Sequence, residues 1–323
     1  RALAERLQLN QRLLKAGSRN RVTSIADFIG SRFGKDQKLA AAVAVVALIG
    51  TLPYIALQLR AIALAWSSAT VKDWSLPFSL SANASFFATL FLVWFALTFG
   101  TRIIDGTNRQ RGLMAVVATE SVVKVIAFLA LGIFAAWLLV DQPELTADLS
   151  SPFEGATFQS PGFYSQLLIS AIAIICLPRQ FHVLVVEYHD QKSARLARWM
   201  FPLYLALFAL AVLPLVHASR AVLGDMAIPG DSYVLALPSV SGQAWLTGLA
   251  FVGALSAATA MVLVATIALS LMISNELILP AYLRLRNRSS RPRADLGHVL
   301  RTTRRGAIVG ILLLSWVLEQ SAR

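Results

Sequence analysis

Charged residues are scarce in this sequence, and cysteine occurs only once. Of the 323 residues, 14% are charged and 57% are hydrophobic, and the mean hydropathy is +0.65. An ordinary soluble domain has about a quarter of its residues charged. The composition therefore excludes a typical soluble domain and indicates a membrane protein.

Several kinds of functional motif are missing as well. The single Cys176 lies in an apolar run, which excludes a disulfide framework and a cysteine-rich metal site. The sequence has no glycine-rich phosphate loop, no Cys/His zinc spacing and no Ser/His/Asp constellation, so we expect no catalytic residue, no metal and no cofactor. An initiator methionine and a signal peptide are also missing, and the last apolar run ends close to Arg323. We therefore expect a fragment of a longer protein.

Long apolar runs are what the sequence does contain. A helix needs about 20 apolar residues to cross a hydrocarbon layer of about 30 Å, and a helix satisfies every backbone group within its own segment. The runs predict an all-α, polytopic membrane protein with one membrane domain over 1–323. Seven spans are expected, at about 39–66, 86–104, 113–140, 166–186, 199–222, 246–279 and 306–320.

The net charge of +12 comes from Lys and Arg that are concentrated in alternate loops. Most of them lie in 1–38, 102–111, 187–198 and 280–305, whereas the intervening loops, such as 141–165, are richer in Asp and Glu. By the positive-inside rule, the amino terminus of the chain is cytoplasmic and the 141–165 loop is outside. This distribution disfavours nucleic acid as a partner and predicts a lipid bilayer as the surroundings.

Two basic segments flank the apolar runs. Residues 1–38 form a basic lead-in, in which Ser24 resembles an N-cap and Ile25 and Phe28 lie on one side of a short amphipathic helix at the inner membrane surface. The Arg-rich stretch 284–293 suits either a solvated cytoplasmic loop or a site for anionic lipid.

Four stretches, in order along the chain, resemble core helices of the sodium/solute symporter family. They are VTSIADFIGSRFG at 22–34, GLMAVVATESVVK at 112–124, Gln180-Phe181-His182, and WLTGLAFVGALSAATAMVL at 245–263. The resemblance implies a LeuT-type fold of two inverted repeats, with a binding site at the repeat interface near the middle of the bilayer. On that map the chain holds core helices 3 to 9, and core helices 1, 2 and 10 are missing.

These stretches are most similar to the symporter-like domain that precedes the kinase in CbrA-type sensor histidine kinases. The similarity implies a sensory or transport module for a small polar solute such as an amino acid, in the cytoplasmic (inner) membrane of a bacterium. It also implies a response regulator as the partner of a missing kinase module, because no kinase motif occurs within 1–323. The alternative is a stand-alone solute:cation symporter with no kinase.

Ionisable residues inside apolar runs are the candidates for function, because a charge within the bilayer is costly unless it finds a partner or water. Glu120 lies about 10 Å from the cytoplasmic end of its run, and Lys124 follows one turn later on the same helix face. The two residues form either an internal ion pair or, as the family resemblance implies, a cation-coupling site at Glu120 with Thr119 beside it.

A second polar group approaches a similar depth from the same side of the membrane. Arg179, Gln180 and His182 follow Pro178, which removes a backbone hydrogen bond and loosens the helix. We expect these three residues to form a polar layer with Glu120 and Lys124, facing a water-filled inner vestibule. His182 is either a neutral core histidine or a proton relay.

The last motif concerns ion coupling. The resemblance to core helix 8 places Ala257, Ala260 and Met261 at the family's sodium-site positions. Sodium is a hard cation that prefers oxygen ligands, which these side chains do not supply, so we expect proton coupling or no ion coupling. On the same alignment Thr259 points about 100° away, around the helix axis, from the sodium-site positions. The small residues of 253–260 allow close helix approach.

Overall fold

The structure is a computed structural model, and it is helical throughout the residues that it describes. These residues are 22–70, 79–100, 111–142, 160–187, 191–226, 228, 230–286 and 296–322. Within those ranges no strand is present, which confirms the predicted all-α class. Most of the basic lead-in, the loop residues 143–159 and most of the Arg-rich stretch lie outside the described residues.

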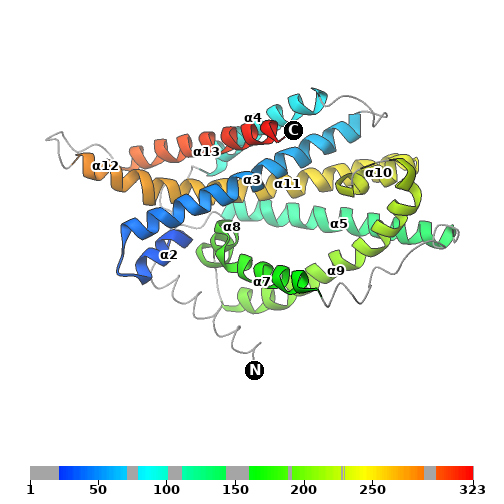
Figure 1. The fold of residues 1–323 in the computed structure, drawn as a ribbon, viewed down its shortest axis with the longest axis horizontal. Helices are drawn as coiled ribbons and strands as arrows, with labels where there is room; N and C mark the ends of the chain where they lie inside the picture. The colour runs from blue at the N-terminus through cyan, green and yellow to red at the C-terminus, as the bar shows by residue number, and fades with distance from the viewer. Residues whose placement is uncertain are drawn as a thin grey trace.

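The helices that run along the long axis of the molecule form its main body (Figure 1). They are α3 (Gln37–Thr70), α4 (Ser79–Gly100), α5 (Arg111–Asp141), α11 (Ala244–Met272) and α13 (Leu296–Ser321). The remaining elements flank this body or continue its helices. They are α2 (Ile25–Arg32), α7 (Pro161–Cys176), α8 (Pro178–Phe181), η2 (His182–Val186), α9 (Gln191–Leu223), η3 (Gly224–Met226), η4 (Gly230–Ser232), α10 (Tyr233–Val240), η5 (Ile273–Ile278) and α12 (Leu279–Arg286).

Among the described residues, four helices are long and apolar enough to cross a membrane, or five if the bent pair of α7 and α8 is one span. The four are Gln37–Trp66, Met114–Asp141, Arg195–Leu223 and Ala244–Leu285. The described apolar part of α4, Ala84–Gly100, is shorter. All seven predicted spans overlap helices, but not all of these helices are shown to be long and apolar enough to cross a membrane: the described apolar part of α4 is short, and α13 begins with several basic residues.

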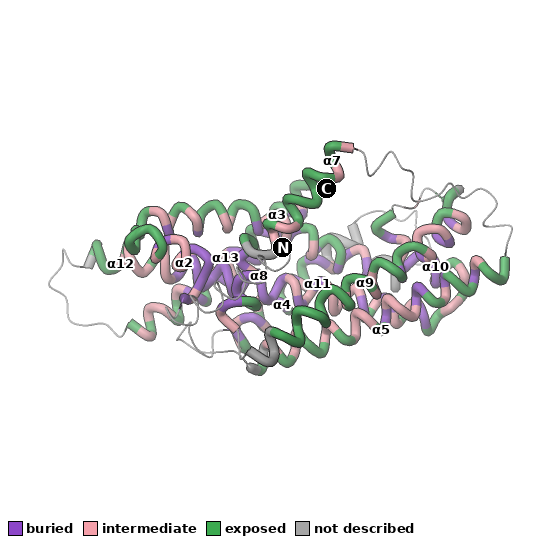
Figure 2. The backbone as a smooth tube through the Cα atoms, turned by 90° about the horizontal axis from the view of Figure 1, so that it is seen from below, coloured by how far each residue is buried: buried purple, intermediate pink, exposed green. Residues whose placement is uncertain are grey.

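The helix α11 lies at the centre of the bundle. It packs against α3, α5 and α13, and it also contacts α4, α8 and α10. Its residues from Val262 to Met272 are all buried. A helix that is apolar on every side is stable in such a position, surrounded by other helices. Figure 2 shows the buried segments gathered in the middle of the bundle, whereas α7 is mostly exposed.

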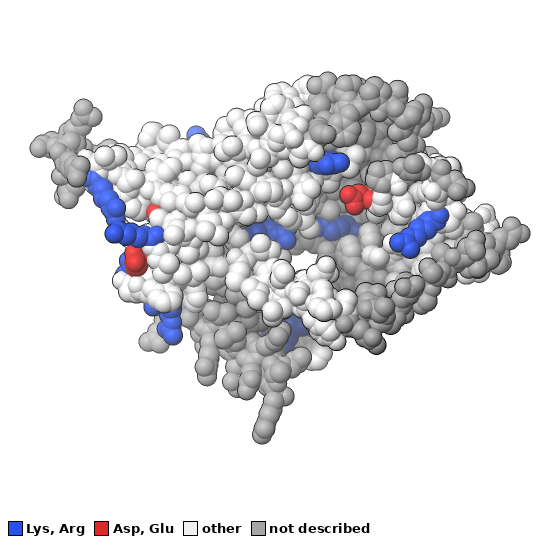
Figure 3. Space-filling model, in the orientation of Figure 1, with Lys and Arg blue, Asp and Glu red and all other residues white. Residues whose placement is uncertain are grey.

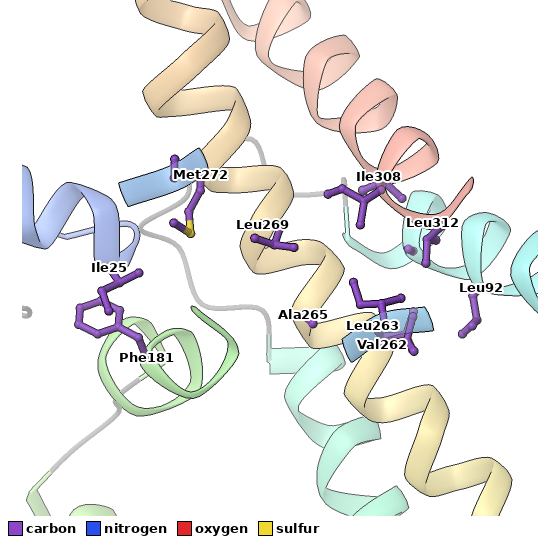
Figure 4. Packing of buried hydrophobic residues seen from close by; sticks show 14 of the residues in the cluster. Ile25, Leu92, Phe181, Val262, Leu263, Ala265, Leu269, Met272, Ile308 and Leu312 are labelled. Atoms are coloured by element: carbon purple, nitrogen blue, oxygen red, sulfur yellow. The ribbon is translucent and has the colours of Figure 1, made fainter. Parts of the chain in front are cut away.

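The main apolar core joins α11 to elements from both ends of the chain. Figure 4 shows Leu269 and Met272 of α11 between Ile25 and Phe181 on one side and Ile308 on the other. A second core packs α5, α9, α10 and the first half of α11 around Leu131, Leu237 and Leu246.

The predicted short helix after the lead-in forms as α2, and Ser24 caps it. The Ser24 hydroxyl accepts a hydrogen bond from the Asp27 backbone N–H at 3.1 Å, and Asp27 accepts one from the Thr23 N–H at 2.9 Å. Its apolar side packs on protein, because Ile25 is buried and the Phe28 ring lies 5.7 Å from that of Phe181. The helix α2 therefore belongs to the core as well as to the end of the bundle.

Small residues bring α5 close to its neighbours. A Cβ added to Gly253 of α11 would lie 2.5 Å from the Cβ of Ala127 on α5, and one added to Gly132 of α5 would lie 2.7 Å from the Cβ of Ala211 on α9. Both distances are too short for real carbon atoms, so these contacts require glycine. The close approach expected for 253–260 is thus confirmed at Gly253.

Candidate functional site

Polar side chains from four helices meet where α3, α5, α8 and α11 come together. We call this group the polar cluster, and it consists of Tyr54, Glu120, Lys124, Arg179, Ser256 and Thr259. Three of its members, Glu120, Lys124 and Arg179, belong to the polar layer expected from the sequence. The other three supply hydroxyl groups from α3 and α11.

A break in the helix carries Arg179 to this place. Pro178 disfavours a helical conformation in the residue before it, and Leu177 is extended, with φ −68° and ψ 128°. The segments on either side of the break differ in direction by 44°. Pro178 then occupies the first turn of α8, where its missing N–H costs nothing. The predicted loosening of the helix at Pro178 is therefore confirmed as a complete break.

Arg179 is held by Tyr54 of α3. Its Nη1 donates a hydrogen bond to the Tyr54 hydroxyl at 3.0 Å, and the guanidinium carbon lies 5.5 Å from the centroid of the tyrosine ring. The second distance is within the range of a cation–π contact. The Tyr54 hydroxyl in turn donates to Sδ of Met261 at 2.8 Å. This chain of contacts links α8, α3 and α11.

Glu120 is joined to α11 by two hydroxyl groups. Ser256 Oγ donates to the backbone carbonyl of Glu120 at 3.0 Å, and Thr259 Oγ1 lies 3.4 Å from Glu120 Oε1. The Thr259 hydroxyl has one proton, which it can donate either to Glu120 or to the backbone carbonyl of Leu255 at 2.9 Å. Among the described residues, Glu120 Oε2 is buried and has no hydrogen-bond donor. A buried oxygen of this kind calls for a proton, water or a ligand.

No hydrogen bond or ion pair joins Lys124 to another described residue of the polar cluster. Lys124 lies one turn after Glu120 on α5 and interacts electrostatically with Glu120 and with Arg179. The Glu120 interaction is attractive and the Arg179 interaction is repulsive. The ion pair that the i to i+4 spacing suggested for Glu120 and Lys124 is not among the described ion pairs, and with Arg179 these residues form a group of two cations and one carboxylate.

His182 and Gln180 occupy different surroundings. His182 is only 3% exposed, and its Nε2 lies 3.7 Å from Glu187 Oε1, which is too long for a hydrogen bond. Within the described part of the chain, that nitrogen has no hydrogen-bond partner. The neighbouring Phe181 anchors the same turn in the apolar core. Gln180 is half-buried, and no described hydrogen bond joins it or His182 to the polar cluster.

The remaining sequence candidates lie beside the polar cluster. Thr119 is exposed and its hydroxyl donates to the Ala115 carbonyl of its own helix at 3.0 Å. Ala260 is buried, and Ala257 is half-buried. Met261 contributes its sulfur to Tyr54. The resemblance to core helix 8 predicted that Thr259 points away from the sodium-site positions. In the structure, Thr259 is the α11 residue whose hydroxyl reaches the Glu120 carboxylate.

Sequence reasoning did not single out Tyr54 as a site residue. The feature that could have identified it is an aromatic residue with a hydroxyl group directly after Pro53, within the first apolar run. A second buried carboxylate was also missed. Glu319 of α13 is 3% exposed and accepts hydrogen bonds from Ser85 of α4 at 3.2 Å and from Gln320 at 3.1 Å. It fastens α4 to α13 away from the polar cluster.

Figure 3 shows how the charges lie on one face of the molecule. Most of the described surface is uncharged, as expected for helices that face lipid. Basic side chains are nevertheless visible in the middle of this face, over the region where Figure 1 places α5 and α8, beside a hollow. In the described ranges, no group of three or more His, Cys, Asp or Glu is arranged to hold a metal ion.

Comparison of the chain with protein-family models, with curated proteins and with solved structures finds no match.

Proposed function

We propose that this chain is the solute-binding part of a multi-pass membrane protein, related to the sodium/solute symporters, and that the polar cluster forms its binding site. The proposed fold is the LeuT type, with core helices 3 to 9 in this chain. The solute is small and polar, such as an amino acid. In the full protein the domain acts as the sensory or transport module of a sensor histidine kinase, whose kinase module contacts a response regulator.

One observation carries the proposal. Charged groups from α5 and α8 meet hydroxyl groups from α3 and α11 inside a bundle whose core is mainly apolar. Ionisable side chains within apolar spans mark solute or ion pathways, because burying them without such a role is costly. A site shared by four helices also suits a switch, since a solute that binds one helix arrangement better shifts the population toward it.

The proposed coupling ion is a proton, with Glu120 as its acceptor. Met261 gives its sulfur to Tyr54, and Ala257 and Ala260 carry no oxygen, so these positions do not offer sodium the ligands that it prefers. Glu120 supplies the carboxylate of the polar cluster, and one oxygen of this carboxylate has no hydrogen-bond donor among the described residues. A proton on that oxygen would remove the charge, which lowers the cost of burying the carboxyl group.

Transport by the full-length protein tests this proposal. Proteoliposomes would be given labelled amino acids with either a proton gradient or a sodium gradient. We expect uptake driven by the proton gradient, and loss of that dependence in Glu120→Gln. Uptake driven by sodium alone would contradict the assignment of the ion.

The kinase part of the proposal needs a separate measurement. We expect phosphate incorporation into the full-length protein to change when the solute is added. The stand-alone symporter is the second candidate, favoured by the same polar cluster. Solute uptake without any phosphate incorporation would favour it over the sensor.

A further inference from the structure

The polar cluster has more positive than negative charge. Arg179 of α8 and Lys124 of α5 lie close enough for their charges to repel each other, and Glu120 is the acidic group that acts on Lys124. The groups that α3 and α11 contribute here, Tyr54 and Thr259, are hydroxyls without formal charge. One positive charge is therefore left without a counter-charge among the described side chains of this site.

The two cations also have unused hydrogen-bond donors. A guanidinium has five N–H donors and an ammonium has three. In the described part of the chain, the Arg179 side chain donates one hydrogen bond, to Tyr54, and Lys124 donates none to a protein group. Tyr54 holds the guanidinium from one side by the hydrogen bond and the ring contact, which keeps it oriented while its other donors stay available.

Both cations are half-buried, so they are neither fully solvated nor sealed in the core. A small molecule that reached these two side chains would meet donors that water hydrates incompletely. Hydrogen bonds between charged groups are about twice as strong as those between neutral ones, and a guanidinium matches the two oxygens of a carboxylate.

We propose that the solute bound by the polar cluster carries a carboxylate, which Arg179 and Lys124 bind, with Tyr54 as the residue that positions Arg179. This inference rests on the proposed function and names the chemical class of its solute. The carboxylate neutralises the excess positive charge and relieves the repulsion between the two cations. Neutral sugars and choline lack this group and are excluded.

The test is a binding measurement on the full-length protein in nanodiscs of zwitterionic phospholipid, which keeps anionic lipid headgroups away from the site. Thermal unfolding would be followed with matched probes, each a carboxylic acid and its amide: acetate and acetamide, succinate and succinamide, L-proline and L-prolinamide. Glucose and choline complete the set. We expect at least one carboxylate to raise the unfolding temperature, and its amide to bind at least about tenfold more weakly.

Variants locate the site. Arg179→Gln and Lys124→Gln are each expected to weaken carboxylate binding about 10- to 100-fold, because a hydrogen bond between charged groups is lost. The matched controls are the exposed residues Arg301 and Lys38, where Arg301→Gln and Lys38→Gln leave binding unchanged. Tyr54→Phe keeps both cations and is expected to weaken binding less than Arg179→Gln does. Carboxylate binding that is equal in all these variants would overturn the assignment.

A measurement on the unmodified protein covers the case in which the charge variants fail to fold. Phenylglyoxal reacts with arginine, and peptide mass spectrometry would follow its reaction at Arg179. We expect the binding carboxylate to slow the reaction at Arg179 and to leave the reaction at Arg301 unchanged. Absence of protection would overturn the inference.

The outcomes also separate this inference from the proposed function. Binding of glucose, choline or an amide as tightly as any carboxylate would refute the carboxylate site and leave solute binding intact. Stabilisation by anionic lipid alone, with no effect of the free carboxylates, would assign the cations to a lipid headgroup and refute the inference. If no compound of any class bound, both would fail.

Discussion

At the scale of single residues, the contacts of Glu120 show how a carboxylate is held inside an apolar bundle. Its Oε1 has Thr259 within 3.4 Å, whereas its Oε2 has no donor among the described residues. The Thr259 hydroxyl divides its proton between this carboxylate and the carbonyl of Leu255. The carboxylate is thus only partly satisfied by protein groups, which suits a residue that exchanges a proton or contacts a solute.

Replacement of Thr259 by valine tests this contact. Thr259→Val keeps the shape of the side chain but removes the hydroxyl, so Glu120 loses a donor and we expect a stability loss of about 1 kcal/mol. Thr247 on the same helix provides the control, because its hydroxyl donates to the Gln243 carbonyl one turn earlier. Thr247→Val is expected to change stability by less than about 0.5 kcal/mol.

Denaturant unfolding of the purified protein, followed by circular dichroism, measures both changes. Equal losses in the two variants would mean that the contact between Thr259 and Glu120 contributes nothing specific.

At the scale of elements, the break between α7 and α8 decides where Arg179 lies. The extended Leu177 and the proline after it turn the chain by 44°, and the π-helical η2 follows at once. In η2 the Glu187 N–H donates to the His182 carbonyl at 3.0 Å, five residues back. Such widened turns are frequent at functional sites.

Replacement of Pro178 by alanine tests the cause of the break. Alanine restores the N–H and removes the restriction on Leu177, so we expect α7 and α8 to straighten toward one helix. Spin labels at Leu168 and Leu184, both exposed, would be placed in a Cys176→Ser background. Double electron–electron resonance should give a longer mean distance in Pro178→Ala.

Pro161 is the matched control for this measurement, because it also occupies the first turn of its helix but lies far from the break. Pro161→Ala is expected to leave the distance unchanged. An unaltered distance in Pro178→Ala would show that tertiary packing, and not the proline, maintains the bend.

The packing of α5 against α11 predicts that replacing glycine by alanine destabilises the protein at one position of α11 and stabilises it at another. Gly253→Ala would place a Cβ 2.5 Å from the Cβ of Ala127, so we expect the helices to separate at a cost of about 1 to 3 kcal/mol. Gly248 on the same helix has open space around it. Gly248→Ala is expected to stabilise the helix by up to about 1 kcal/mol, because alanine has the higher helix propensity.

Denaturant unfolding measures the stability change in each variant. Light scattering of the detergent-solubilised protein checks that neither variant aggregates. A stabilising Gly253→Ala would contradict the close approach of α5 and α11.

At the scale of the whole molecule, the helix directions put the start of α3 and the end of α5 at opposite ends of the bundle. The chain enters α3 close to Lys35 and leaves α5 at Asp141, two helices later in the sequence. In Figure 1 these points lie at opposite ends of the long axis. The distribution of basic residues predicts that the end with Lys35 is cytoplasmic.

Cysteine labelling in intact cells tests that orientation. In a Cys176→Ser background, Asp141→Cys should react with a membrane-impermeant maleimide added outside, and Lys35→Cys should react only after lysis. Both positions are exposed, so burial does not limit either reaction. The reverse pattern would invert the topology and with it the position of the polar cluster relative to the cytoplasm.

The sequence by itself determined the helical class, the short helix after Ser24 and the break at Pro178. Each of these follows from local rules: apolar runs of spanning length, an N-cap, and the restriction that proline places on the preceding residue. The i to i+4 spacing likewise placed Glu120 and Lys124 on one helix face. These features need no knowledge of neighbouring helices.

Only the tertiary structure decided which side chains meet across helices. Tyr54 and Arg179 are 125 positions apart and Glu120 and Thr259 are 139 apart, so no local periodicity joins them. His182 was expected with Glu120, but no described hydrogen bond or ion pair joins the two, and the His182 Nε2 lies 3.7 Å from Glu187 Oε1. The rotation of α11 against α5, set by the close contact at Gly253, directs Thr259 toward Glu120. That rotation depends on how the side chains of two whole helices pack together, so it cannot be read from the residues of either helix alone.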